Sequence, residues 1–269
     1  MPPRFLIEAK PLGTVASATV YAELKQRRRP AKDGRAARLV AFGDPVYPPL
    51  PLAEASPDGA LRSALRSGLR LDPLPGTRDE VESLATIYPG ARILVGNEAT
   101  EERAKELSGG ATILHFACHA VLDERSPLDS ALALTIPSRP RRGQENGLLQ
   151  AWEIFEQLRL DASLVTLSAC QSALGRELGG EGLMGLTRAF QYAGARTVLA
   201  SLWNISDAST AKLMKRFYQA LAAGQPKDEA LRAAQLELLR SSPRESANTS
   251  LDSSHPFYWA AFELVGDDH

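Results

Sequence analysis

The chain has 269 residues, of which 44% are hydrophobic and 23% charged, and its 31 Lys and Arg balance 32 Asp and Glu. The net charge of −1 gives no electrostatic support to nucleic-acid or membrane-surface binding. Two cysteines are too few for a disulfide scaffold, and no stretch resembles a signal peptide or a membrane span. The length suits one sizeable α/β domain, which we expect to be cytoplasmic.

The chain begins with a short apolar segment, followed by the basic run from Lys25 to Pro30. A run of like charges next to a proline is usually solvated. We therefore expect residues 1–36 to form an N-terminal segment and basic linker, and residues 37–269 to form one domain.

Apolar runs and amphipathic stretches then alternate along the chain. Thr77 and Glu80 have the spacing of a capping box, which predicts the start of a helix before Val81. The alternation predicts a three-layer α/β/α fold with a mostly parallel sheet of about six strands. We expect strands over 38–42, 91–95, 111–120, 131–135, 163–170, 196–202 and 257–265, and helices over 61–69, 77–88, 100–108, 152–158, 183–193, 208–222 and 231–238.

Two of these predicted strands carry the residue types of thiol chemistry. The first, over 111–120, contains His119, and the second, over 163–170, ends in Cys170. Parallel neighbours lie about 4.8 Å apart, and the carboxyl ends of strands in open α/β sheets line a ligand crevice. Cys170 follows His119 by 51 residues, close to the roughly 50 that separate the corresponding residues of caspases. We therefore expect the two side chains to meet in one crevice.

Five motifs, in this order along the chain, resemble the CHAT family, whose domains are often found behind tetratricopeptide repeats. The family is more distantly similar to separases and caspases, which are cysteine endopeptidases. The resemblance implies a caspase-like fold, a protein substrate and no cofactor, with activity gated by an upstream or separate tetratricopeptide-repeat sensing region. The motifs are His115–Ala120, Ser168–Ser172, Gly180–Phe190, Ala193–Asp207 and His255–Phe262.

The spacing and the resemblance together predict a catalytic dyad. Cys170 would be the nucleophile, and the positive end of the helix that follows it would lower the pKa of its thiol. His119 would act as the acid and the base. The backbone amides of Ala120 and Cys170 would bind the oxyanion. Caspases carry glycine where this chain has Ala120, a difference that matters only if the backbone φ there must be positive.

Asp207, Asn204 and Ser168 are candidates for the pocket that receives the P1 residue of a substrate. The segment 202–207 looks like a separase segment whose aspartate receives a P1 arginine, and a carboxylate binds guanidinium bidentately. Capping of the helix over 208–222 explains Asp207 equally well. Ser168 stands where metacaspases have an aspartate, so a basic P1 preference is a hypothesis.

The loop over 137–147 carries Arg139, Arg141 and Arg142 between the two catalytic candidates. Self-cleavage there is conceivable with a basic P1 preference, although a solvated loop is the favoured interpretation. The glycines between 175 and 185 lack the Gly-Lys-Ser/Thr ending of a phosphate loop, so we expect a mobile loop beside the cleft.

A metal site is the competing use of His115, Cys118 and His119. Cys118 would face away from the histidines on a strand, and no further ligand motif completes a shell, so no metal is expected. We expect His115 to be a hydrogen-bonded core residue or a support for the site, and Cys118 a small core residue.

We therefore predict a cytosolic cysteine endopeptidase. Two alternatives from other classes stay open: a non-catalytic caspase-like interaction module, and a hydrolase acting on a non-peptide acyl group. An activated thiolate at Cys170 would distinguish either enzyme from the interaction module.

Overall fold

A six-stranded sheet forms the centre of the protein in the computed structural model, which describes residues 5–26, 37–48, 71–138, 145–168, 170–171, 180–203, 207–241 and 254–267. Its order is β10-β9-β7-β3-β1-β2, and every neighbouring pair is parallel except β10 with β9. The expected mostly parallel sheet is confirmed. Its strands are β1 (Leu39–Pro45), β2 (Arg92–Gly96), β3 (Ile113–Ala117), β7 (Leu164–Leu167), β9 (Thr197–Ser201) and β10 (Phe262–Gly266).

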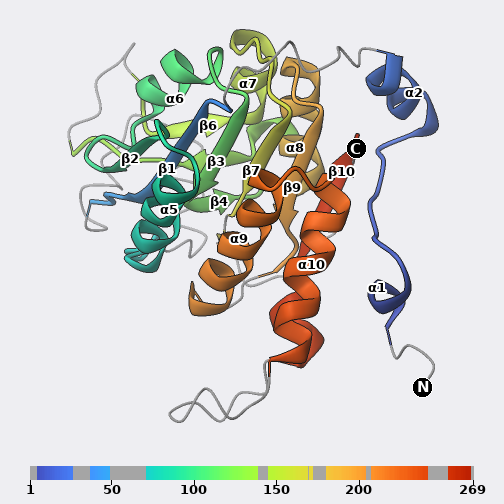
Figure 1. Ribbon diagram of the computed structural model, residues 1–269. Helices are drawn as coiled ribbons and strands as arrows, with labels where there is room; N and C mark the ends of the chain where they lie inside the picture. The colour runs from blue at the N-terminus through green and yellow to red at the C-terminus, as the bar shows by residue number, and fades with distance from the viewer. Residues whose placement is uncertain are drawn as a thin grey trace.

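Helices cover both faces of this sheet and complete three layers (Figure 1). Alternate residues of β3 point to opposite faces, so Leu114 and Phe116 enter one core, while Ile113 and Ala117 enter the other. The first core also takes residues of α6 (Glu101–Ser108), α7 (Ala151–Gln157) and α8 (Glu181–Ala193). The second takes residues of α5 (Gly76–Ile87), α9 (Asp207–Ala222) and α10 (Lys227–Arg240).

A second, four-stranded sheet continues two strands of the first. Its order is β6-β5-β4-β8, with β4 parallel to β8 and the other pairs antiparallel. The chain leaves the large sheet at Cys118, so the single strand expected over 111–120 is in fact two strands in two sheets, and the run over 163–170 divides likewise. The bounds are β4 (His119–Val121), β5 (Ala131–Ala133), β6 (Leu148–Gln150) and β8 (Cys170–Gln171).

The predicted capping box at the start of α5 is wrong. The helix begins at Gly76 without a side-chain cap. The Thr77 hydroxyl donates instead to the carbonyl of Leu74, and the Glu80 carboxylate is buried 3.0 Å from His115 Nε2. The sequence spacing fits a cap, but the carboxylate lies in the core because a buried histidine faces it.

The other helices expected within the described residues are present, and one expected strand near the carboxyl end differs. Thr100 caps α6 by accepting the N–H of Arg103, as expected. The strand expected over 257–265 is shorter, because its first residues form a one-turn helix, α11 (Pro256–Trp259), before β10. The helix expected over 61–69 lies outside the described residues. No helix in the described part of the chain has both the length and the apolar character needed to cross a membrane.

The described residues before β1 contact the domain at α10 and along β10, and Arg232 of α10 donates to the carbonyls of Ile7 and Glu8. They contain α1 (Leu6–Ala9) and α2 (Ala18–Gln26). Thr14 forms a parallel bridge with Val265 of β10, and Lys25 Nζ lies 2.7 Å from the carboxylate of Asp267. The contacts of Thr14 and Lys25 attach the segment to the edge of the sheet where β10 lies, and those of α1 attach it to α10.

A buried ionic cluster joins α6, α7 and the chain leading into β6. Lys105 Nζ lies 2.8 Å from Glu101 Oε1, 2.7 Å from Glu145 Oε2 and 2.7 Å from Glu153 Oε1. Glu101 also accepts the backbone N–H groups of Asn146 and Gly147. Burial, together with the hydrogen bond to Glu145, raises the pKa of Glu101 to about 8. The single lysine therefore holds three separate segments together.

We expect Lys105→Met to lower the free energy of unfolding by about 3–5 kcal/mol, because it leaves buried carboxylates without their cation. Urea unfolding followed by circular dichroism measures the change. Arg103→Met is the matched control on the same helix, since Arg103 pairs with Glu98 and Glu106 in solvent and should unfold almost as the wild type does. Equal midpoints for the two variants would contradict the importance of the cluster.

Candidate active site

The structure brings the backbones of His119 and Cys170 together. They are Cα partners in the parallel pairing of β4 with β8, followed by Ala120 with Gln171. Adjacent strands place such partners about 4.8 Å apart. The pair lies in the four-stranded sheet, not at the tips of one large sheet as the sequence suggested. The side chain of Cys170 is outside the described part of the structure.

The imidazole of His119 has one nitrogen fixed by a backbone carbonyl. Its Nε2 lies 2.8 Å from the carbonyl oxygen of Asp72, and the residue is only 6% exposed. A carbonyl can only accept a hydrogen bond, so Nε2 carries the proton and Nδ1 has the lone pair in the neutral ring. Burial lowers the pKa of His119, outweighing the opposite effect of Asp72. Burial therefore favours the neutral ring, in which Nδ1 is the atom that would accept a proton.

Tyr47 supports His119 from a second direction. Its ring centroid lies 5.3 Å from that of the imidazole. Its hydroxyl donates to the carbonyl of Ala133 in β5 and accepts the backbone N–H of His119 at 3.4 Å. The tyrosine thus connects the strand that carries His119 to the neighbouring strand.

Asp72 and Tyr47 were not found by sequence reasoning. Asp72 contributes its backbone carbonyl, which every residue type has, so its identity gave no signal. Tyr47 lies in the proline-rich stretch that follows β1, and an aromatic residue among prolines was the only hint.

Two of the remaining site candidates have described surroundings. Ala120 does not have a positive φ, since Asp44 is the only non-glycine residue with one in the described residues. Alanine in place of glycine therefore causes no backbone strain there. Ser168 follows β7 and is 5% exposed, and its hydroxyl has no hydrogen-bond partner within the described residues. A buried hydroxyl without a partner costs about 1–3 kcal/mol, so the position favours a polar ligand group.

The other candidates fall wholly or partly outside the described structure. The backbone of Asp207 forms the first residue of α9, and nothing is described of its side chain or of Asn204. The helix end expected just after Cys170 falls on residues 172–179, which are also outside, and α8 begins at Glu181 after Gly180 with φ of +83°. The three arginines of the 137–147 loop are outside as well.

His115 and Cys118 occupy the positions expected of them. His115 is fully buried and its Nδ1 lies 2.9 Å from the Tyr218 hydroxyl, which confirms a hydrogen-bonded core histidine. Cys118 is fully buried among the apolar residues of the α6–α8 core. His119 is in a different sheet from His115, so the three residues do not form the shell of a metal.

One cluster in the described residues has the spacing of metal ligands, namely Glu101, Glu145 and Glu153. Lys105 Nζ lies within 2.8 Å of an oxygen of each carboxylate. The ammonium group thus occupies the position that a cation would take, and the cluster is satisfied as an ionic network of the fold.

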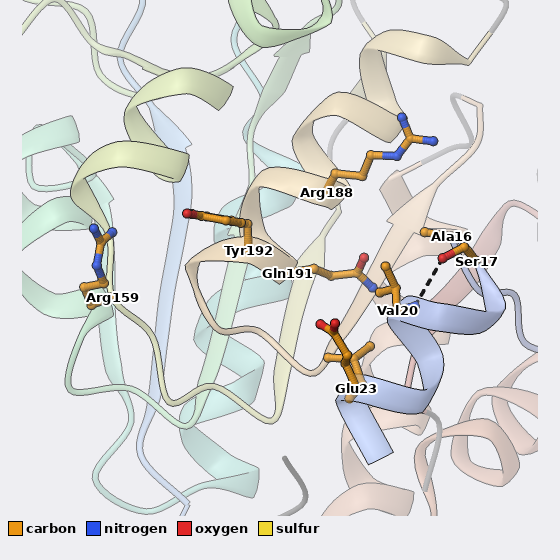
Figure 2. A pocket seen from close by; sticks show the side chains of 9 residues that line it. Ala16, Ser17, Val20, Glu23, Arg159, Arg188, Gln191 and Tyr192 are labelled. Atoms are coloured by element: carbon orange, nitrogen blue, oxygen red, sulfur yellow. Dashed lines mark hydrogen bonds between the residues drawn. The ribbon is translucent and has the colours of Figure 1, made fainter. Parts of the chain in front are cut away.

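A groove of about 720 Å³ lies between α2 and α8, away from this pair of strands (Figure 2). Val20 and Leu24 of α2 form one wall, and Gln191 and Tyr192 of α8 form the other. None of the six candidate residues lines it, so the groove is separate from the candidate active site.

Comparison with known proteins gives a family and a fold. The family model described as CHAT domain matches residues 2–267. Tetratricopeptide repeat protein 28 is 31% identical in mouse, over 77% of this chain and 9% of that protein. The human protein of the same name is 28% identical over 98% of this chain and 11% of that protein. The chain thus spans about a tenth of these relatives.

Two crystal structures of the separase–securin complex from Saccharomyces cerevisiae share the architecture. They align with TM-scores of 0.53 and 0.50 at 14% and 13% sequence identity, in each case over 94% of this chain. The alignments cover 14% and 13% of those chains. At this identity the likeness concerns the fold, and it confirms the resemblance to separases indicated by the sequence motifs.

We expect the pKa of His119 in the folded protein to lie below 6.5, because burial disfavours the imidazolium form. A lowered pKa means that the stability contributed by this group is complete above pH 6.5 and is lost as the pH falls through the folded value. An NMR titration of the imidazole, assigned by the signal missing in His119→Gln, measures the value. The urea-unfolded chain is the reference, and a folded pKa at or above that reference would contradict the prediction.

Proposed function

Because the chain belongs to the CHAT domain family, we propose that it is a cysteine endopeptidase with Cys170 as nucleophile and His119 as acid and base. The pairing of these two residues as Cα partners is the observation that supports the proposal most strongly. A thiol and an imidazole on adjacent strands are within reach of the contact that thiol activation requires.

The environment of His119 suits the proton transfers of this reaction. The Nδ1 lone pair takes the proton of the Cys170 thiol, and the thiolate attacks the peptide carbonyl to form an acyl-enzyme. The imidazolium then protonates the leaving amine, and water hydrolyses the thioester with His119 as base. The carbonyl of Asp72 accepts a hydrogen bond from the Nε2–H group throughout and stabilises the charged ring. The amides of Ala120 and Cys170 are the proposed oxyanion donors.

The thiol itself tests the proposal before any substrate is known. We expect Cys170 to react with iodoacetamide below neutral pH, and His119→Ala to slow the reaction, because the imidazole favours the thiolate. Peptide mapping by mass spectrometry separates Cys170 from Cys118, the buried second cysteine, which serves as the internal control. A Cys170 that reacts no faster than the thiol of the unfolded chain would favour a non-catalytic interaction module.

Proteolysis itself is tested by the new N-termini that appear in a proteome incubated with the protein. We expect Cys170→Ala and His119→Ala to lower cleavage by about a thousandfold or more, as loss of a catalytic dyad does. An activated thiol without new N-termini would favour a hydrolase that acts on a non-peptide acyl group. This outcome would overturn the peptidase proposal and keep the dyad.

A basic P1 residue is the substrate preference that we propose, with Asp207 as the anion that binds it. The buried Ser168 hydroxyl, which has no partner in the described residues, offers a further polar group at the carboxyl end of β7. Asn204 is the neighbouring candidate.

Profiling of a peptide library tests the P1 preference. We expect arginine and lysine to be preferred and Asp207→Asn to lose the preference by about tenfold or more, since a bidentate carboxylate–guanidinium contact is removed. Asp161→Asn is the control, because Asp161 is exposed and precedes β7 at the opposite edge of the sheet. A preference of the wild type for uncharged P1 residues would contradict the hypothesis.

Gating by a sensing region outside this chain is part of the proposal. The tetratricopeptide-repeat relatives support it, because the chain aligns with only 9% and 11% of their length. Helical repeats form extended concave surfaces for partners, so such a region could sense a signal and release the peptidase. We place this activity in the reducing cytoplasm, where a thiol nucleophile persists.

A further inference from the structure

A series of buried polar groups runs from β3 to β7 beneath the candidate active site, on the face of the sheet that α5 and α9 cover. His115 Nδ1 lies 2.9 Å from the Tyr218 hydroxyl, which lies 2.8 Å from the Thr166 hydroxyl. On its other side, His115 Nε2 is 3.0 Å from Glu80 Oε1, in a contact whose geometry falls short of a hydrogen bond. All four residues are at most 3% exposed. The proposed reaction uses none of these groups.

In both strands, the polar residues of this series lie four residues before the proposed catalytic pair. His115 precedes His119 by four residues, and Thr166 precedes Cys170 by four. His115 and Thr166 are Cα partners in the pairing of β3 with β7, just as His119 and Cys170 are in the pairing of β4 with β8. The offset of 51 residues is therefore the same in both sheets. An interaction that fixes the pairing of His115 with Thr166 therefore also fixes the pairing of His119 with Cys170.

Apolar side chains alone specify this register weakly. The flanking residues of β3 and β7 are leucine, isoleucine, valine and phenylalanine, and apolar cores tolerate exchanges among such residues when the total volume is kept. A slip by one residue would turn Thr166 to the opposite face and remove its contact with the buried hydroxyl of Tyr218. Polar groups are satisfied in one register only, so they can select it.

We propose that the chain Glu80–His115–Tyr218–Thr166 is a positioning device that fixes the register of β3 against β7 and thereby holds His119 opposite Cys170. Tyr218 is its central member, because its hydroxyl touches the side chains of both strands. The four residues act through the strands and touch no substrate. Only the chemical meaning of the held pair rests on the proposed function.

The helices that supply the chain also carry other parts of the candidate site. Glu80 lies in α5, and Asp72, whose carbonyl binds His119, lies just before that helix. Tyr218 lies in α9, whose first residue is Asp207. Helices α5 and α9 pack directly against each other. The device therefore joins the two catalytic strands to the two helices next to the site.

A disulfide across the pair measures the register without any substrate. His119→Cys places a second thiol opposite Cys170, and Cα partners about 4.8 Å apart lie within the range of 4.4–6.8 Å that a disulfide needs. All variants carry Cys118→Ala, so that positions 119 and 170 hold the only thiols. The effective molarity of the disulfide is read at equilibrium in a glutathione redox buffer.

We expect Tyr218→Phe and Thr166→Val to lower this effective molarity by at least about tenfold, the equivalent of one lost hydrogen bond between buried groups. The double variant should be no worse than Tyr218→Phe alone, because Tyr218→Phe already removes the contact with Thr166. Thr166→Ser keeps the hydroxyl and should restore the wild-type value. Tyr88→Phe should leave it unchanged, since that ring packs edge-on against Tyr218 at 6.1 Å, outside the hydrogen-bond chain.

Each outcome decides the inference separately from the peptidase proposal. Effective molarities within twofold of the parent in both Tyr218→Phe and Thr166→Val would overturn the positioning role, even if both variants unfolded more easily. A loss in Thr166→Ser equal to that in Thr166→Val would do the same, because it would trace the effect to packing. The expected pattern in a protein that cleaves no peptide would keep the register device and remove the peptidase.

Discussion

Parallel pairing with one constant offset is the constraint on which the candidate site depends. His119 and Cys170 are far apart in the chain, and no contact between neighbouring residues can bring them together. The register of β3 with β7 brings them together, because it continues unchanged into β4 and β8. The pleat has a period of two residues, so a slip by one would send one of the two side chains to the opposite face. The site is thus only as well defined as the strand register below it.

The same constraint explains why polar groups are buried beneath the site. Burying a histidine, a carboxylate and two hydroxyl groups costs solvation, and apolar residues of similar shape could fill the space more cheaply. His115 and Tyr218 nevertheless lie at the centre of a closely packed core, between α5, α9 and the sheet. A buried polar network adds little net stability, but it distinguishes the correct arrangement from near alternatives.

Backbone groups do part of the positioning at the site itself. The imidazole of His119 is oriented by the carbonyl of Asp72, and the strand that carries it is joined to β5 through the Tyr47 hydroxyl. A backbone carbonyl leaves no trace in the sequence, because any residue can supply it. Its position depends on where the chain enters α5, and hence on tertiary structure.

Sequence patterns predicted the layers and the order of elements well, because apolar periodicity reflects burial directly. They failed where a local pattern and a tertiary contact compete for the same residue. Thr77 and Glu80 have the spacing of a cap, but Glu80 faces a buried histidine that lies 35 residues later in the chain. The break at Cys118 was not visible either, because an unbroken apolar run does not show where a strand changes sheet.

The sequence between β4, which carries His119, and β8, which carries Cys170, is held at both of its ends. After β4 the chain pairs as β5 and then returns as β6, which is antiparallel to β5. Just before β6, Glu145 is bound to Lys105, and the next two backbone N–H groups donate to Glu101. A cut anywhere between residues 139 and 144 would therefore leave both flanking strands paired and the return segment attached to α6. Self-cleavage in this stretch would release neither β4 nor β8, so its effect would have to act on the approach to the candidate site.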